Sequence, residues 1–184
     1  MKQIYTTVAM FLIAAISFAQ QPIITSIVDG TCSGGTPKLI EIYASGTVDF
    51  TQFTLEKSAN GGAFGTGFDL SGFGTRTDSF VYVYSGTEAI LNSEFPNITA
   101  SDYLSSNTAN NNGDDAIRII ETASTTVIDI YGAEVDGTGE TWEYLDSYAK
   151  RVDGTGPDAT FNQANWTNTA PNTLDGQCGT STFE

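Results

Sequence analysis

The stretch from Asp115 to Tyr131 reads DAIRIIETASTTVIDIY, and it decides the fold. In its first part, charged Arg118 interrupts apolar neighbours at a period of two. This is typical of a strand with one solvent-exposed face and one face packed in the core. Four small residues, 122–125, separate this run from a second one at residues 126–131. The two runs therefore predict a β-hairpin.

Similar short runs of Val, Ile, Thr, Tyr and Phe recur along the chain between clusters of Gly, Asn, Asp and Ser, whereas helical periodicity is almost absent. Only residues 87–94 predict a helical turn or two, ending before Pro96. About eight short strands indicate an all-β sandwich. The predicted strands are Ile23–Val28, Leu39–Ser45, Phe53–Lys57, Phe80–Tyr84, Asp115–Glu121, Thr126–Tyr131, Thr141–Leu145 and Tyr148–Val152.

Residues 1–19 have the form of a cleavable secretory signal. Lys2 precedes an apolar run from Val8 to Phe18, and the segment ends in the small-residue pattern Ser17-Phe18-Ala19. The run is too short for a permanent membrane anchor. We therefore expect residues 20–184 to form one mature domain that is not inserted in a membrane and is secreted, to the extracellular space, the cell surface or the periplasm.

The chain is strongly acidic, with a formal net charge of -15, and loss of Lys2 with the signal makes the mature protein more negative still. The electric field of so much negative charge repels phosphate backbones and anionic lipids alike, so direct DNA binding without metal is disfavoured. The same acidity suits a soluble secreted protein, or one that recruits divalent cations.

The chain has two cysteines, Cys32 and Cys178, near the two ends of the mature domain. In an oxidising compartment we expect a disulfide between them, and two unpaired thiols are the alternative.

Two parts of the chain resemble the lamin-tail domain family. One is the segment Asn112–Ile119 followed by Val127–Gly132, and the other is Ile40–Gly46 leading through Val48–Phe50 to Phe53–Leu55. In that family a strand that reads Ile-Glu-Leu precedes a strand that usually begins Gly-Trp, where this chain has Gln-Phe.

The later segment Asp136–Tyr144 is similar to the version of this domain found on secreted bacterial proteins, including some extracellular nucleases. The resemblance covers nearly the whole mature chain. It implies an immunoglobulin-like β-sandwich that serves as a binding or anchoring module.

Histidine, which many common catalytic systems need, is missing from the chain. The chain has no histidine, which removes Ser-His-Asp and Cys-His systems, His-ligated zinc and the commonest general base at neutral pH. The glycine-rich stretch Gly61–Gly67 lacks the Lys-Ser/Thr ending of a phosphate loop. We therefore expect a protein that is not an enzyme and carries no resident cofactor.

Oxygen-rich turns leave calcium binding as an open alternative. The tetrapeptide Asp-Gly-Thr-Gly occurs at 136–139 and at 153–156, and two aspartates follow an Asn-rich stretch at 110–113. Such turns can hold calcium, but Asp-Gly also supplies left-handed backbone geometry without any ion, which is the interpretation we favour. The candidate calcium ligands are Asp114, Asp115, Asp136, Glu140 and Asp153.

Glu134, Asp136 and Glu140 are separated by even numbers of positions, two and four, and would line one face of a true strand, as in a glycosidase, but Gly-Thr-Gly interrupts them. Trp142 and Tyr144 are the candidate binding aromatics beside them, and packing of Trp142 in the sandwich is the alternative.

The leading hypothesis is an exported, non-catalytic, lamin-tail-like binding or anchoring module that contacts a protein, a glycan or a surface at the cell envelope. The first alternative is an accessory module that captures nucleic acid beside a secreted nuclease, with calcium offsetting the negative field. The second is a carboxylate-based glycosidase.

Overall fold

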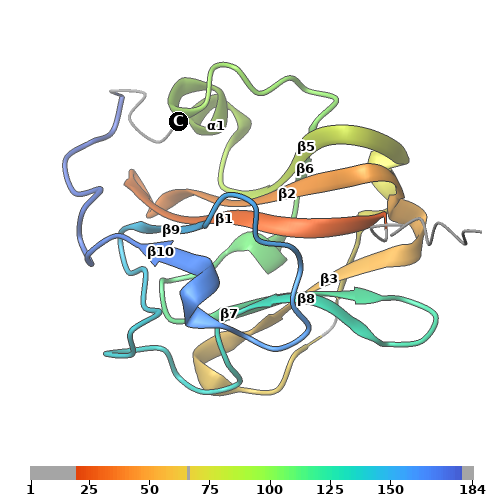
Figure 1. The fold of residues 1–184 in the computed structure, drawn as a ribbon. Coiled ribbons are helices and arrows are strands. Elements are labelled where there is room, and N and C mark those ends of the chain that lie inside the picture. Colours follow the sequence, from red (N-terminus) through yellow and green to blue (C-terminus); the bar gives the residue numbers. More distant parts are fainter. Residues whose placement is uncertain (1–19, 66, 180–184) are drawn as a thin grey trace, which may run out of the picture.

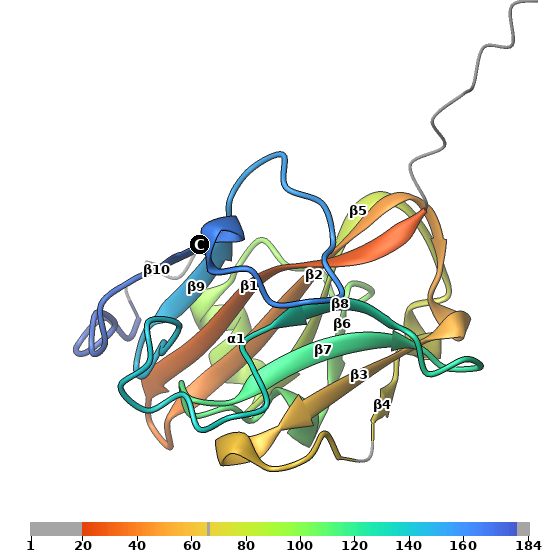
Figure 2. The ribbon, with the colours of Figure 1, turned by 60° about the horizontal axis from the view of Figure 1, so that its bottom comes forward.

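The structure is a computed structural model that describes residues 20–65 and 67–179, and in these ranges ten strands form two sheets packed face to face (Figure 1, Figure 2). The predicted all-β sandwich is thereby confirmed. One sheet has six strands in the order β10-β9-β1-β2-β5-β6, and the other has four in the order β4-β3-β7-β8. The predicted signal, residues 1–19, lies outside the described residues.

The strands of the six-stranded sheet are β1 (Gln21–Cys32), β2 (Thr36–Asp49), β5 (Thr75–Ser85), β6 (Tyr103–Ser105), β9 (Tyr148–Arg151) and β10 (Trp166–Asn168). Those of the four-stranded sheet are β3 (Phe53–Ser58), β4 (Phe68–Asp69), β7 (Ala116–Glu121) and β8 (Val127–Tyr131). The helix is α1 (Glu88–Glu94), and the 3-10 turns are η1 (Phe50–Gln52), η2 (Ala59–Gly61), η3 (Leu70–Phe73), η4 (Asn107–Ala109) and η5 (Gln163–Asn165).

The predicted hairpin is present, because β7 pairs with β8 antiparallel and Ile117 lies opposite Tyr131. A second and longer hairpin joins β1 to β2, with Ile24 opposite Ile42. Alternation along β2 buries Ile40 and Ile42 completely between the sheets, whereas Glu41 lies on the outer face. Each sheet therefore supplies one apolar face to the core.

The core between the sheets contains aliphatic side chains from both sheets and an aromatic cluster around Tyr131. The Tyr131 ring meets Trp142, Tyr144 and Trp166 edge-on, with centroid distances of 6.0, 5.4 and 4.6 Å. Edge-to-face packing suits the ring quadrupoles. The cluster fixes the loop after β8 and the strand β10 to the sandwich.

A buried ion pair also crosses from one sheet to the other. Arg151 on β9 donates from Nη2 to both carboxylate oxygens of Asp129 on β8, each at 2.6 Å. Asp129 further accepts from the backbone N–H groups of Ile24 and Asp158, at 2.8 and 2.9 Å. The four-stranded and six-stranded sheets are thus joined by charge as well as by apolar packing.

The short helix α1 covers one end of the outer face of the six-stranded sheet (Figure 1). It begins after Thr87, whose side chain accepts from the Ile90 N–H, as a helix N-cap does. Its Leu91 and the following Phe95 pack on Val28 and Leu39 of the sheet. The predicted helix at 87–94 is confirmed, and it forms a second, smaller apolar cluster.

Cys32, at the end of β1, forms a disulfide with Cys178, with a Cα–Cα distance of 5.3 Å. The predicted disulfide is confirmed. In the described part of the chain, no helix is both long and apolar enough to cross a membrane.

One predicted strand is wrong and three short ones were not predicted. Residues 141–145 form turns and irregular backbone, because Tyr144 donates its N–H to Gly113 O at 2.8 Å and Glu143 accepts from the Gly139 N–H at 3.0 Å. The segment therefore forms hydrogen bonds with neighbouring turns and loops and not with a strand of either sheet. The strands that the sequence pattern did not predict are β4, β6 and β10.

Candidate functional site: a groove across the six-stranded sheet

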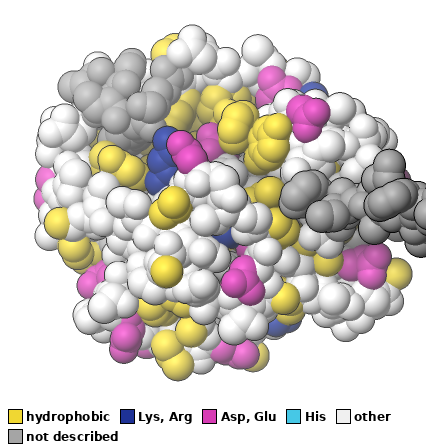
Figure 3. All heavy atoms as spheres, viewed as in Figure 1, with side chains coloured by type: hydrophobic (Ala, Val, Ile, Leu, Met, Phe, Trp, Pro, Cys, Tyr) yellow, Lys and Arg dark blue, Asp and Glu magenta, His cyan; other side chains and the backbone are white. Residues whose placement is uncertain are grey.

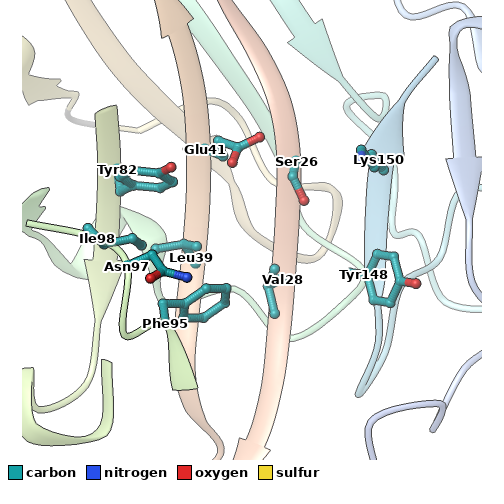
Figure 4. Close-up of a pocket in the computed structure, with 10 residues that line it drawn as sticks. All are labelled: Ser26, Val28, Leu39, Glu41, Tyr82, Phe95, Asn97, Ile98, Tyr148 and Lys150. Carbon is teal, nitrogen blue, oxygen red and sulfur yellow. The ribbon is translucent and has the colours of Figure 1, made fainter. Parts of the chain in front are cut away.

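Two hollows lie on the outer face of the six-stranded sheet, with volumes of about 430 and about 560 Å³. Glu41 and Lys150 line both hollows, so the two adjoin, and together we call them the sheet groove. Figure 4 shows the residues that line the smaller hollow. Each volume falls in the range of ligand-binding sites, roughly 300–1,000 Å³.

The groove exists because neighbouring strands send every second side chain outward. Burial of Ile40 and Ile42 on β2 places Leu39, Glu41 and Tyr43 on the outer face. The same alternation on β5 and β9, which flank β2 and β1, presents aromatic and charged side chains beside them. The outward residues from these two strands that line the groove are Phe80, Tyr82, Tyr148 and Lys150.

Aromatic and aliphatic side chains occupy the two ends of the groove. At one end, Tyr43 and Phe80 pack ring against ring with centroids 5.0 Å apart, and Phe80 is 44% exposed. At the other end, Phe95 and Ile98 from the segment after α1 lie on one side of the hollow and Tyr148 lies on the other (Figure 4). An exposed ring on a rigid sheet offers an apolar contact at low conformational cost.

The middle of the groove is polar. Glu41 Oε1 accepts from Thr25 Oγ1 at 2.7 Å, and Lys150 projects from β9 on the far side of Ser26 (Figure 4). Burial raises the pKa of the Glu41 carboxyl, and the Thr25 hydrogen bond and the Lys150 charge oppose that rise. Glu41 is therefore a partly desolvated carboxylate that a ligand can reach.

The loop 152–156 forms the rim of the groove at the Phe80 end. Thr155 folds back on Val152 through its N–H and its hydroxyl, at 3.1 and 2.7 Å from Val152 O. Arg151 Nη1 donates to Gly156 O at 2.9 Å, so the buried ion pair also holds the far end of this loop. Asp153, one of the candidate calcium ligands, lies in this ordered rim.

The structure brings three other candidate calcium ligands together near the start of β7. Asp114 accepts from Thr138 Oγ1 at 3.2 Å and its backbone carbonyl accepts from Gly137 N at 3.1 Å, which places Asp136 beside it. Asp115 pairs with Lys57 at 3.3 Å. Glu140 lies one turn further on, exposed.

These carboxylates do not form a ready-made metal centre. Over residues 20–65 and 67–179, no group of three or more His, Cys, Asp or Glu side chains is arranged to hold a metal ion. Asp114 is 9% exposed and its Oδ1 has no hydrogen-bond partner, and burial together with the charges of Asp115 and Asp136 raises its pKa. Calcium binding stays an open alternative to the interpretation that these residues form turns without an ion.

Trp142 and Tyr144 belong to the core and not to a binding surface. They are 4% and 0% exposed, and Tyr144 Oη donates to Asp115 O at 3.0 Å. Packing of Trp142 in the sandwich, the alternative to a binding role, is confirmed. The segment that carries Glu134, Asp136 and Glu140 is not a strand, so these carboxylates do not line one sheet face.

The residues of the sheet groove were not predicted from the sequence. A signal was available, because Leu39-Ile40-Glu41-Ile42-Tyr43 is apolar on both faces apart from Glu41, and Phe80–Tyr84 alternates aromatic with valine. A strand that is apolar on both faces needs something to cover its outer one. Here α1 covers only part of it.

Comparisons of the chain with protein-family models, with curated proteins and with solved structures found no match. The class defined by fold and site together is that of a β-sandwich with a ligand-sized groove on one sheet face.

Proposed function

We propose that this protein is an exported, non-catalytic binding module that holds its ligand in the sheet groove. The observation that carries the proposal is the exposed Phe80, which packs on Tyr43 of the paired strand β2 and lines the same hollow as the half-buried Glu41. Convergent apolar and polar groups in one depression are the usual mark of a binding site.

The chemistry of the groove favours binding over catalysis. The carboxylates that line it are Glu41 and Asp153, and the chain has no histidine to act as a base. The resemblance to lamin-tail domains agrees with a binding or anchoring role. The signal-like residues 1–19 and the Cys32–Cys178 disulfide support export, where such a bridge persists.

The test is retention of the fluorescently labelled protein, residues 20–184, on envelope preparations of the producing cells. We expect the parent protein to be retained and Phe80→Ala to lose retention, since it removes the exposed ring. Val135→Ala is the control, because Val135 is 50% exposed but lies beside Gly61, after β3 of the other sheet. Equal retention of all three proteins, or of none, contradicts the proposal.

A further inference from the structure

We propose that the ligand of the sheet groove is a neutral oligosaccharide chain. This inference rests on the proposed function and names the class of ligand. Three features of the groove support it, namely the order of its side chains, its charges and its place on the sheet.

The groove alternates apolar rings with polar groups, as a sugar chain alternates C–H faces with hydroxyl edges. Tyr43 and Phe80 provide an aromatic surface at one end, and Phe95 and Tyr148 provide apolar surface at the other. Between them, Glu41 and its neighbours offer hydrogen bonds. A chain of a few sugar rings can therefore place a ring face on each apolar end and hydroxyls in the middle.

Glu41 is the group best placed to recognise a hydroxyl. Its Oε1 accepts from Thr25, which leaves Oε2 to accept from the ligand. A hydrogen bond from a neutral hydroxyl to a partly desolvated carboxylate is charge-assisted and stronger than a neutral one. Lys150, across the same depression, supplies a donor to a ring or hydroxyl oxygen.

The charges in and around the groove disfavour an anionic ligand. Lys150 faces the two carboxylates of Glu41 and Asp153, and Arg151 is 5% exposed and bound to Asp129. The whole chain carries a formal charge of -15. An acidic polysaccharide or a nucleic acid would meet repulsion here, whereas a neutral chain would not.

The position of the groove on the sheet disfavours an extended peptide. Peptides that add to a sheet gain affinity from main-chain hydrogen bonds at an edge strand. The middle of the groove lies over Ser26 and Glu41, where the strands are paired on both sides. Ser26 lies opposite Glu41 and Lys150, and Glu41 lies opposite Ser26 and Tyr82. A ligand across this part of the groove finds no unpaired strand edge, and the side chains that line the groove are the groups that would hold it.

The experiment is isothermal titration of the protein, residues 20–184, with cellohexaose, laminarihexaose, mannohexaose, chitohexaose and maltohexaose. We expect at least one to bind. Phe80→Ala and Glu41→Gln should each weaken that binding by about tenfold or more, which corresponds to the loss of one strong contact. Val135→Ala should bind as the parent does, and the melting temperatures of all variants show whether each is folded.

The outcomes separate this inference from the proposed function. If none of the five sugars binds while envelope retention still depends on Phe80, the oligosaccharide inference is wrong. The proposal that the sheet groove binds a ligand is then still supported. Binding of polygalacturonate or of an unrelated peptide at the Phe80 site, in place of a neutral sugar, would likewise contradict the oligosaccharide inference. It would still support the sheet groove as the binding site. If a sugar binds equally to the parent, Phe80→Ala and Glu41→Gln, the groove is not its site and the inference fails.

Discussion

At the scale of single residues, the surroundings of Asp114 conflict with its charge. The side chain is nearly buried, Oδ1 has no partner, and the carboxylates of Asp115 and Asp136 lie nearby. Burial, followed by these charges, raises the pKa of Asp114 in the folded state. This raised pKa adds to the free energy of unfolding when the pH is below the unfolded-state pKa of Asp114. The gain is lost as the pH rises through the folded-state pKa.

Asp114→Asn should consequently raise the melting temperature at neutral pH by a few degrees. The amide has no charge to desolvate and its oxygen can still accept from Thr138. The advantage should shrink as pH falls through the raised pKa of Asp114, where the parent side chain becomes protonated. Thermal melts across this range test the prediction. Asp136→Asn is the comparison, because the Thr138 hydrogen bonds lower the pKa of Asp136, and its effect should have the opposite sign.

Calcium should leave the melting temperature of the parent protein unchanged. Asp136 Oδ1 already accepts from the Thr138 N–H at 3.0 Å, and Asp115 already pairs with Lys57, so these turns are complete without an ion. The check is a melt in excess calcium against one in chelator. A rise in calcium that disappears in Asp114→Asn would contradict this expectation and identify Asp114 as a ligand, because ligands that bind only the native state stabilise it.

At the scale of secondary-structure elements, the Asp129–Arg151 pair joins β8 to β9 and β1. Both side chains are buried, and Arg151 Nε also donates to Ile24 O at 2.7 Å. Asp129→Asn removes the negative partner and leaves a buried guanidinium without a counter-charge. We expect a loss of about 3 to 5 kcal/mol in the free energy of unfolding, measured by urea denaturation.

Glu56→Gln is the matched control for this prediction. Glu56 pairs with Arg118 across β3 and β7 at 2.7 Å, but on the outer face, where both side chains stay partly exposed. Water screens such a pair, and its loss should change the free energy of unfolding by less than about 1 kcal/mol. Equal effects of Asp129→Asn and Glu56→Gln would show that the buried pair does not hold the sheets together.

Elements with strong alternation were predictable, and elements defined only by distant contacts were not. The hairpin β7–β8 and the strand β2 follow from their own residues. Residues 141–145 also alternate, with Trp142 and Tyr144 at a period of two, yet both rings pack into the core from irregular backbone. The strands β4, β6 and β10 have two or three residues each, too few for a periodic signal.

The sheet groove was harder to predict, because its residues are brought together by strand order. Tyr43, Phe80 and Lys150 lie on β2, β5 and β9, and local patterns do not show that β1 lies between β2 and β9. The pattern at 39–43 contained part of the signal, since it is apolar on both faces. The aromatics at 142 and 144, adjacent in sequence to a carboxylate cluster, were the more conspicuous choice and are buried.

At the scale of the whole molecule, the Cys32–Cys178 disulfide closes a loop that spans a sequence separation of 146. The C-terminal segment is also held by Glu94 Oε1, which accepts from Gly179 N at 2.7 Å. Replacing both cysteines with serine should lower the free energy of unfolding by up to about 5 kcal/mol, because the unfolded chain regains the entropy of an open loop. Urea denaturation of the double variant checks this, and an unchanged midpoint would contradict it.

The distribution of charge leaves little positive surface for a nucleic acid. Acidic side chains are scattered over the face in Figure 3, with few basic ones among them. Five of the six Lys and Arg side chains in residues 20–65 and 67–179 are held in ion pairs with Asp or Glu. Lys150, the sixth, faces Glu41 in the sheet groove.

We therefore predict that the protein neither binds nor cleaves DNA in the presence of a chelator. Affinity for DNA comes from Lys and Arg contacts with phosphates and the release of counterions, and here the cations are already paired within a negative field. Cleavage would further need an activated water, and in a chain without histidine that task falls to carboxylates, which show no recognisable nuclease spacing. The measurement is a low-salt gel shift with a nicking assay, each run in chelator and again in calcium or magnesium. Sub-micromolar binding in chelator would refute the electrostatic argument, whereas binding only with metal would support the accessory nucleic-acid module over the glycan-binding one.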